Sequence, residues 1–274
     1  MRIERHLDPV AFRDLVTPFL LRDEARFNLE IAITAKVADG KRYSADPPVY
    51  LSVHDGDEVA GMALMTPPWN LQLAAVPPVA IPDVVRYVVD HGIGVPGAMA
   101  AAPEVRAFAD AYAAATGVTA RDGTAQGVYK LTTLIPARPV SGALREATED
   151  DYDLVIAWDE AFQVDAGLTP IAARRTEVKD SPTWLWDDDG PVSMVGVGGF
   201  TPNGARIGPV YTPKELRGRG YASAATAAVT ALMFDRGCTC AFLYTDLGNP
   251  TSNKIYRDLG YEPVTEVLAV TFDR

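Results

Sequence analysis

The sequence predicts an α+β protein built from two tandem halves, each a mixed and mostly antiparallel sheet flanked by helices, joined near residues 136–142. The main observation is a repeated β-hairpin signal. The runs "VYLSVHDGDEVAGMALMTPP" and "TWLWDDDGPVSMVGVGGFTPNG" each hold an Asp-Gly pair between apolar stretches, which is typical of a tight turn. The turns at Asp55 and Asp189 are 134 positions apart, and the Thr-Pro pairs that follow are 135 apart.

The remaining elements repeat in the same order. Each half opens with a short strand, an acidic segment and a helix-like run, in "RIERHLDPVAFRDLV" and "ALREATEDDYDLVIAW". A later helix ends at Gly92 or Gly237, as expected for a C-terminal glycine cap, and a second ends at Gly117 or Gly260. A final strand follows in "GVYKLTTLIP" or "EVLAVTF". This order favours a tandem, with chance similarity of two α/β patterns as the alternative.

Composition excludes several classes of function. The 274 residues are 48% hydrophobic and 22% charged, as in soluble globular proteins. The net charge of -11 disfavours nucleic-acid binding, which needs a basic face. No apolar run approaches the roughly 18 residues of a membrane span, so we expect a cytoplasmic protein without a membrane partner. Cys238 and Cys240 are too close for an ordinary disulfide and too few for a zinc site, so we expect free thiols and no metal.

The two halves differ before the helix that ends at Gly92 or Gly237. The second half has a turn at Asn203-Gly204, the strand "ARIGPVYT" and then "LRGRGYAS", where the first has "WNLQLAAVPPVAIP". A helix N-terminus exposes unpaired N–H groups with partial positive charge, and preceding glycines allow an anion to approach the backbone. Gly218 and Gly220 would give this access, and Arg217 and Arg219 would add donors. The alternative is an ordinary surface turn.

The pattern does not fit two common phosphate-binding motifs. No lysine follows the glycines, as a P-loop requires. Gly218, Gly220 and Ser223 give only a weak dinucleotide fingerprint, after a segment that reads as an antiparallel hairpin.

At these residues the chain resembles the GCN5-related N-acetyltransferase (GNAT) superfamily. Arg217, Gly220 and Ala222 match its [RQ]-x-x-G-x-[GA] pyrophosphate motif, "GPVYTP" resembles its fourth strand, and "LYTDLGNPTSNKIYRDLGYEPV" resembles the strand, helix and final segment that follow. The resemblance is specific over residues 184–264. It implies a catalytic, acetyl-CoA-binding GNAT domain at 139–274 and a degenerate GNAT-like domain at 1–138 without the pyrophosphate motif.

The resemblance also implies a site for acetyl-CoA as cosubstrate. Backbone groups near Tyr211 would pair with its pantetheine arm, and the glycine turn would hold its pyrophosphate. Asn249 and Tyr256 stand where the family has an asparagine and a tyrosine. The cofactor-binding residues so implied are Val210, Tyr211, Thr212, Arg217, Gly218, Arg219, Gly220, Tyr221, Ala222, Ser223, Asn249 and Asn253.

Tyr256 is the catalytic candidate. Asn249-Pro250 predicts a helix over residues 250–259, with Asn253 and Tyr256 on one face. A tyrosine hydroxyl can protonate or stabilise the leaving thiolate, whereas the alternative role is packing beside Tyr261. Asp246 lies near the expected site, either as a base or, more simply, as a turn cap.

Together these residues predict direct acetyl transfer to an amine of an unidentified small molecule or peptide. One alternative is a non-catalytic acyl-CoA-binding sensor or scaffold. Another is a transferase for a longer acyl chain or a non-amine acceptor, which the space beyond Tyr211 would discriminate. The sequence does not indicate the oligomeric state.

Overall fold

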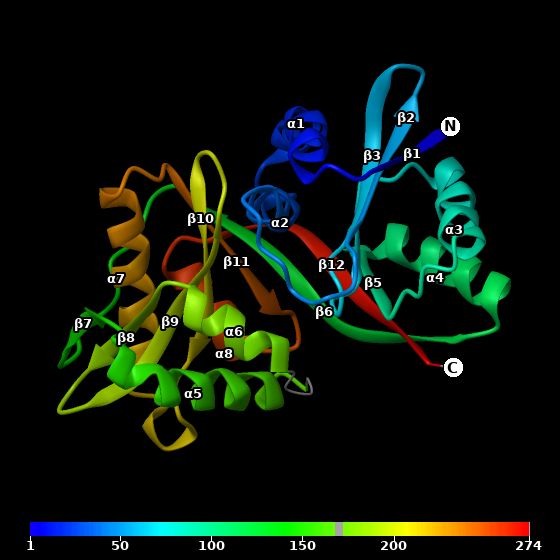
Figure 1. The fold of residues 1–274 in the computed structure, drawn as a ribbon. Helices are drawn as coiled ribbons and strands as arrows, with labels where there is room; N and C mark the ends of the chain where they lie inside the picture. The colour runs from blue at the N-terminus through cyan, green and yellow to red at the C-terminus, as the bar shows by residue number, and fades with distance from the viewer. Residues whose placement is uncertain (168–171, 274) are drawn as a thin grey trace. The chain divides into compact units, whose positions relative to one another are not determined.

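The computed structural model describes residues 1–167 and 172–273, which form two compact units (Figure 1). Unit 1 contains Met1–Gly127 together with Thr265–Arg274, and unit 2 contains Val128–Val264. No helix in the described part of the chain is long and apolar enough to cross a membrane.

The chain passes through the same order of helices and strands twice, so the predicted α+β tandem is confirmed. The first series is β1 (Arg2–His6), α1 (Pro9–Leu20), α2 (Asn28–Ala38), β2 (Val49–Asp55), β3 (Glu58–Met65), β4 (Leu71–Ala74), α3 (Ile81–Asp90), β5 (Gly97–Ala101), α4 (Ala102–Thr116) and β6 (Thr119–Leu131). The second series is β7 (Ala143–Glu146), α5 (Tyr152–Asp165), α6 (Ala172–Asp180), β8 (Thr183–Asp187), β9 (Pro191–Phe200), β10 (Gly204–Tyr211), α7 (Tyr221–Asp235), β11 (Cys240–Asp246), α8 (Pro250–Asp258) and β12 (Glu262–Asp273).

Unit 1 is a sheet with helices on both faces. Its strands follow the order β1-β2-β3-β4-β5-β12, and all neighbours are antiparallel except β4 and β5. One face packs against α1 and α2 through residues such as Phe12 and Ile31, and the other against α3 and α4 through Val84 and Phe108. This two-sided burial explains why every residue of β2 except Asp55 is buried.

Unit 2 repeats this arrangement. Its strands follow the order β6-β11-β10-β9-β8-β7, with β10 and β11 parallel. Helices α5 and α6 pack on one face around Leu185 and Met194, whereas α7 and α8 pack on the other around Val195 and Leu243. The alternation of Met194 and Val195 between the two cores follows from the period of two in a strand.

The division into compact units differs from the expected break between residues 138 and 139. In β12, Val267–Thr271 pair with Gly97–Ala101 of β5, and Leu268 and Val270 lie in the core of unit 1. In β6, Tyr129 and Leu131 lie in the core of unit 2. The last strand of each series therefore contributes part of its length to the other unit. Alternating apolar residues reveal that a strand has a buried face but not which core buries it.

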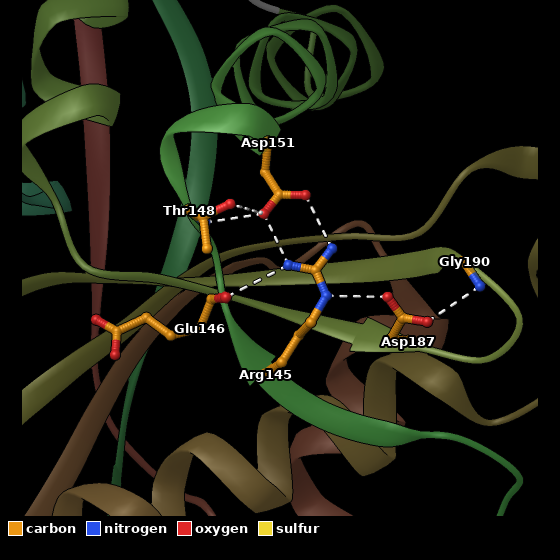
Figure 2. A network of polar contacts seen from close by, with 6 residues as sticks. All are labelled: Arg145, Glu146, Thr148, Asp151, Asp187 and Gly190. Atoms are coloured by element: carbon orange, nitrogen blue, oxygen red, sulfur yellow. Dashed lines mark hydrogen bonds and ion pairs between the residues drawn. The ribbon is translucent and has the colours of Figure 1, made fainter.

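A network of charged side chains fixes the start of the second series, in unit 2 (Figure 2). The guanidinium of Arg145 in β7 donates two hydrogen bonds to Asp151, at 2.7 and 2.8 Å, and one to Asp187 at 2.9 Å. Asp151 also accepts from the Thr148 N–H at 2.8 Å, which completes a capping box before α5. These hydrogen bonds from Arg145 lower the pKa of Asp151. The network joins β7, the start of α5 and the end of β8.

Candidate functional site

Strands β10 and β11 begin as parallel neighbours and then separate. Their paired residues are Gly204–Arg206 and Cys240–Phe242, and the recorded register ends there although both strands continue. On its other side β10 stays paired with β9, but between Ile207 and Val210 it has one residue more than its partner. Such a bulge bends a strand and increases its twist. The bulge therefore coincides with the place where β10 leaves β11.

The three predicted strand residues follow this bulge. Val210 is half-buried and pairs with Val195, whereas Tyr211 and Thr212 are buried. Ser193 of β9 donates to the Tyr211 carbonyl at 3.1 Å, and its hydroxyl lies 2.9 Å from that of Thr212. The end of β10 is thus held firmly from the β9 side, beyond the point where its register with β11 ends.

The glycine turn adopts the backbone that the sequence predicts. Gly218 and Gly220 have φ angles of 79° and 89°, which side chains rarely tolerate. Gly220 is the N-cap of α7, and no side chain among the described residues caps this helix. A Cβ at Gly218 would meet nothing within 4 Å, whereas one at Gly220 would lie 3.0 Å from a methyl group of Val140. The first turn of α7, with Ala222 and Ser223 half-buried, therefore begins beside a backbone that is open to an anion at Gly218.

The two arginines of the turn differ in their contacts. Arg217 donates from Nε to the Thr212 carbonyl at 2.9 Å and from Nη2 to Asp165 at 2.6 Å. Its guanidinium also lies 5.7 Å from the centre of the Tyr211 ring. Arg219 is exposed, and its charge contributes to lowering the pKa of Asp188. Arg217 is therefore held by the protein, while Arg219 extends into solvent.

Tyr221 anchors the first turn of α7 to the hairpin between β8 and β9. Its hydroxyl donates to Asp188 at 2.5 Å, and Ser141 donates to the same carboxylate oxygen at 2.7 Å. These hydrogen bonds, that of Tyr221 first, lower the pKa of the Asp188 carboxyl. Because Tyr221 is buried and bonded in this way, its side chain has a structural contact at the edge of the turn.

Helix α8 begins as predicted and ends at Asp258, one residue earlier than expected. Asn249 is its N-cap and accepts from the Ser252 N–H at 3.1 Å. Asn253 is 5% exposed, and its Nδ2 donates to the carbonyls of Asp246 and Leu247 at the end of β11. These two bonds fix the orientation of the amide. Its Oδ1 is buried without a hydrogen-bond partner.

Two neighbouring tyrosines have different hydroxyl environments. Tyr261 lies 2.9 Å from the Thr230 hydroxyl, so its polar end is satisfied within the core. Tyr256 packs edge-on against Tyr261 with ring centres 6.0 Å apart, and its hydroxyl has no hydrogen-bond partner among the described residues. Burial raises the pKa of Tyr256 to about 12. Tyr256 thus keeps its proton at neutral pH and has a hydroxyl available to a ligand.

Comparison with known proteins assigns unit 2 to a family. Residues 144–261 match the model of the acetyltransferase (GNAT) family. Unit 2 therefore contains a GNAT domain. No curated protein matches the chain.

Solved structures extend the likeness to the fold of the whole chain. A Drosophila protein is 11% identical with a TM-score of 0.70, covering 99% of this chain and 98% of its own. A tandem GNAT protein from the clavulanic acid biosynthesis pathway is 14% identical with a TM-score of 0.57, covering 98% of both chains. A GCN5-related N-acetyltransferase from Sphaerobacter thermophilus is 16% identical with a TM-score of 0.57, covering 98% and 94%. The whole chain thus has the fold of tandem GNAT proteins.

The GNAT domain has an open surface pocket beside the end of β10. It measures about 440 Å³, within the size range of small-ligand sites. Its lining combines apolar and aromatic groups with charged groups at the C-terminal end of α5 and after β10. The lining residues are Trp158, Ala161, Val164, Asp165, Tyr211, Pro213, Lys214 and Glu215.

The sequence did not indicate a role for three residues near the GNAT motif. Asp165 and Lys214 form an ion pair at 2.8 Å beside Arg217, and Asp188 binds Tyr221. Asp165 carries a signal that could have revealed it, because an acidic residue at a helix C-terminus opposes the helix dipole. Asp246, by contrast, accepts from the Gly248 N–H at 2.7 Å, which is a turn-capping contact.

Proposed function

We propose that unit 2 is an acetyl-CoA-dependent N-acetyltransferase that transfers an acetyl group directly to an amine. The observation that carries this proposal is the open glycine turn at the start of α7, which follows a strand that has left its parallel neighbour. The GNAT family match supports acyl transfer as the reaction class. The acceptor is a small molecule or peptide amine.

The described residues fit the diphosphate and the amide-containing arm of such a cosubstrate. The αL glycines and the uncapped start of α7 offer N–H donors to a diphosphate, with Arg217 and Arg219 beside them. The orphaned Oδ1 of Asn253 lies beside the end of β11 and needs a donor, which an amide N–H of pantetheine would supply. Val210 and Thr212, at the end of β10, would face the same arm.

The chain's own chemical contribution is a proton held at Tyr256 Oη. Acetyl-CoA supplies an activated acetyl thioester whose sulfur leaves as a thiolate. Burial keeps this phenol neutral, so it can donate a hydrogen bond to the leaving thiolate, and it can pass its proton to the sulfur when the proton that the amine loses on becoming an amide replaces it. Asn249 acts on the same helix by fixing where α8 starts, and hence where Asn253 and Tyr256 lie.

Unit 1 would have a structural role in this proposal. The segment between β4 and α3 contains no glycine, and the Val76 N–H in it already donates to Glu104, so it offers no open turn like the one before α7. We therefore place acetyl-CoA in unit 2 alone, with one binding site per chain.

Calorimetric titration with acetyl-CoA tests the proposal. Substitution of Gly220 would itself strain the backbone at φ 89°, so Ser223, the third residue of α7, is the better site. Ser223→Glu places a carboxylate where the anion would bind, yet an acidic group in a helix's first turn favours the fold. Ser223→Gln is the uncharged control of equal size.

We expect the wild type to bind one acetyl-CoA per chain and Ser223→Glu to bind at least about tenfold more weakly than Ser223→Gln. Thiol release with a panel of amines then tests turnover. Binding without thiol release from any amine would favour the sensor over the enzyme. No binding by the wild type would contradict the proposal at its first step.

A further inference from the structure

An acidic residue stands at the end of α5 where local helix chemistry disfavours it. Asp165 is the last residue of this helix, and the last turn contains no basic residue. A negative charge there opposes the partial negative charge of the exposed carbonyls. Residues that violate a local preference are often explained by a tertiary contact.

The contact is with two cations that flank the glycine turn. Asp165 Oδ1 lies 2.8 Å from Lys214 Nζ, and Oδ2 accepts from Arg217 Nη2 at 2.6 Å. The side chain of Asp165 is 24% exposed, whereas those of Arg217 and Lys214 are 46% and 67% exposed, so solvent screens the cations more than the carboxylate. The hydrogen bonds from Lys214 and then Arg217 lower the pKa of Asp165, which is ionised at neutral pH.

Arg217 is thereby fixed at three points. Nε donates to the Thr212 carbonyl, Nη2 donates to Asp165, and the guanidinium plane lies near the Tyr211 ring. Nη1 has no acceptor among the described residues, so it remains available to a ligand. A guanidinium held in this way loses less conformational freedom on binding than a mobile one.

We propose that Asp165 is a positioning residue that holds Arg217 ready for the diphosphate of an acyl-CoA. This role rests on the proposed function, because it requires that the turn before α7 binds a diphosphate. Asp165 does not contact the diphosphate. It acts through Arg217, whose Nη1 would make the bond.

The direction in which Asp165→Asn changes the affinity for CoA distinguishes positioning of Arg217 from simple electrostatic repulsion. Removing a carboxylate next to an anion site lessens repulsion, so charge alone predicts tighter CoA binding by Asp165→Asn. Loss of positioning predicts the reverse, because Arg217 must then be ordered on binding. We expect the second effect to dominate and to weaken CoA binding about three- to tenfold.

The experiment compares CoA with pantetheine, which lacks the diphosphate. The wild type, Asp165→Asn, Arg217→Met and the double variant are titrated with both ligands, and thermal unfolding verifies that each variant folds. Weaker CoA binding in Asp165→Asn with unchanged pantetheine binding supports the inference. In the Arg217→Met background, Asp165→Asn should have no further weakening effect on CoA, because the group that it positions is gone.

Three results would overturn the inference and leave the proposed function intact. Equal or tighter CoA binding by Asp165→Asn would mean that Asp165 affects binding only through its charge. Equal loss of CoA and pantetheine would indicate a general structural role. Weakening that persists in the Arg217→Met background would remove Arg217 from the explanation. Failure of the wild type to bind CoA at all would instead refute the proposed function, and this inference with it. Partial recovery in Asp165→Glu, which restores a carboxylate of longer reach, would further support positioning.

Discussion

Strands β4 and β10 occupy the same place in the two units, and their beginnings are alike. Each lies between an antiparallel third strand and a parallel neighbour, and the recorded parallel register covers only the first residues of each. Each also passes close to a glycine of the third strand. A Cβ at Gly61 would lie 2.8 Å from Val76, and one at Gly196 would lie 3.0 Å from Pro209.

The two strands end differently. After β4, Ala75 has a φ of 52° and the Val76 N–H donates to Glu104 of α4 at 2.6 Å. Ala75 adds a backbone hydrogen bond, and burial raises the pKa of this carboxyl despite both donors and nearby Arg26. After β10 come two αL glycines and an uncapped helix. The same topology thus presents backbone donors twice, and unit 1 satisfies them with a carboxylate of its own.

The largest expected difference between the units lies in chemistry at Tyr256. Tyr256 lies four residues before Gly260, the glycine after α8. The residue four positions before Gly117, the glycine after α4 in unit 1, is Ala113. If Tyr256 is the acid, Tyr256→Phe should lower kcat about 100-fold, because a hydroxyl proton is lost while the ring remains. Acetyl-CoA affinity should change less than about twofold. Steady-state kinetics and calorimetry test this, with Tyr261→Phe as the control, and an unchanged kcat would make Tyr256 a packing residue.

The glycine of the third strand should tolerate a side chain less well in unit 1, at Gly61, than in unit 2, at Gly196. Gly61→Ala would push its Cβ against backbone atoms of Ala75 and Val76, which have no rotamer to change. We expect it to lower the free energy of unfolding by about 3 kcal/mol. Gly196→Ala meets the Pro209 ring first and should cost less. Chemical denaturation compares the two variants. Equal losses of unfolding free energy would show that the two close approaches are equally rigid.

The sequence revealed the elements because turn and cap residues act locally. The Asp-Gly hairpins, the N-cap Asn249 and the glycines at 218 and 220 all adopt the predicted conformations. The exchange of β6 and β12 segments between units was not predictable, because apolar residues indicate that a strand is buried but not which core buries it. Glu104 and Asp165 were missed for another reason. Their partners are 28 and 52 positions away, and no local pattern links a carboxylate to such distant donors.

The carboxylate of Glu104 should stabilise unit 1 by a smaller amount. Glu104→Ala leaves the Val76 N–H without its acceptor in a buried place, which we expect to cost about 1–2 kcal/mol of unfolding free energy. Glu104→Gln retains an acceptor oxygen and should cost less. Denaturation of both variants measures this, and acetyl-CoA binding should stay unchanged. A Glu104→Ala variant as stable as the wild type would show that the carboxylate is not needed to satisfy these donors.

The smallest expected difference between the units is a loss of stability at mildly acidic pH that is confined to unit 1, because all three histidines lie there. His6 Nε2 lies 2.7 Å from the Ser52 hydroxyl. Burial lowers the pKa of His6 below 6.5, and His54 lowers it further while Glu4 opposes both. The unfolded chain therefore takes up the proton on His6 first, so stability is full above pH 6.5 and falls as the pH drops below it.

Hydrogen exchange at pH 7.5 and 5.5 should show protection lost in β1 and β2, and less so in His6→Gln than in the wild type. His91→Gln, which removes an exposed histidine at the end of α3, is the control, and equal loss of protection in unit 2 would contradict a source in unit 1.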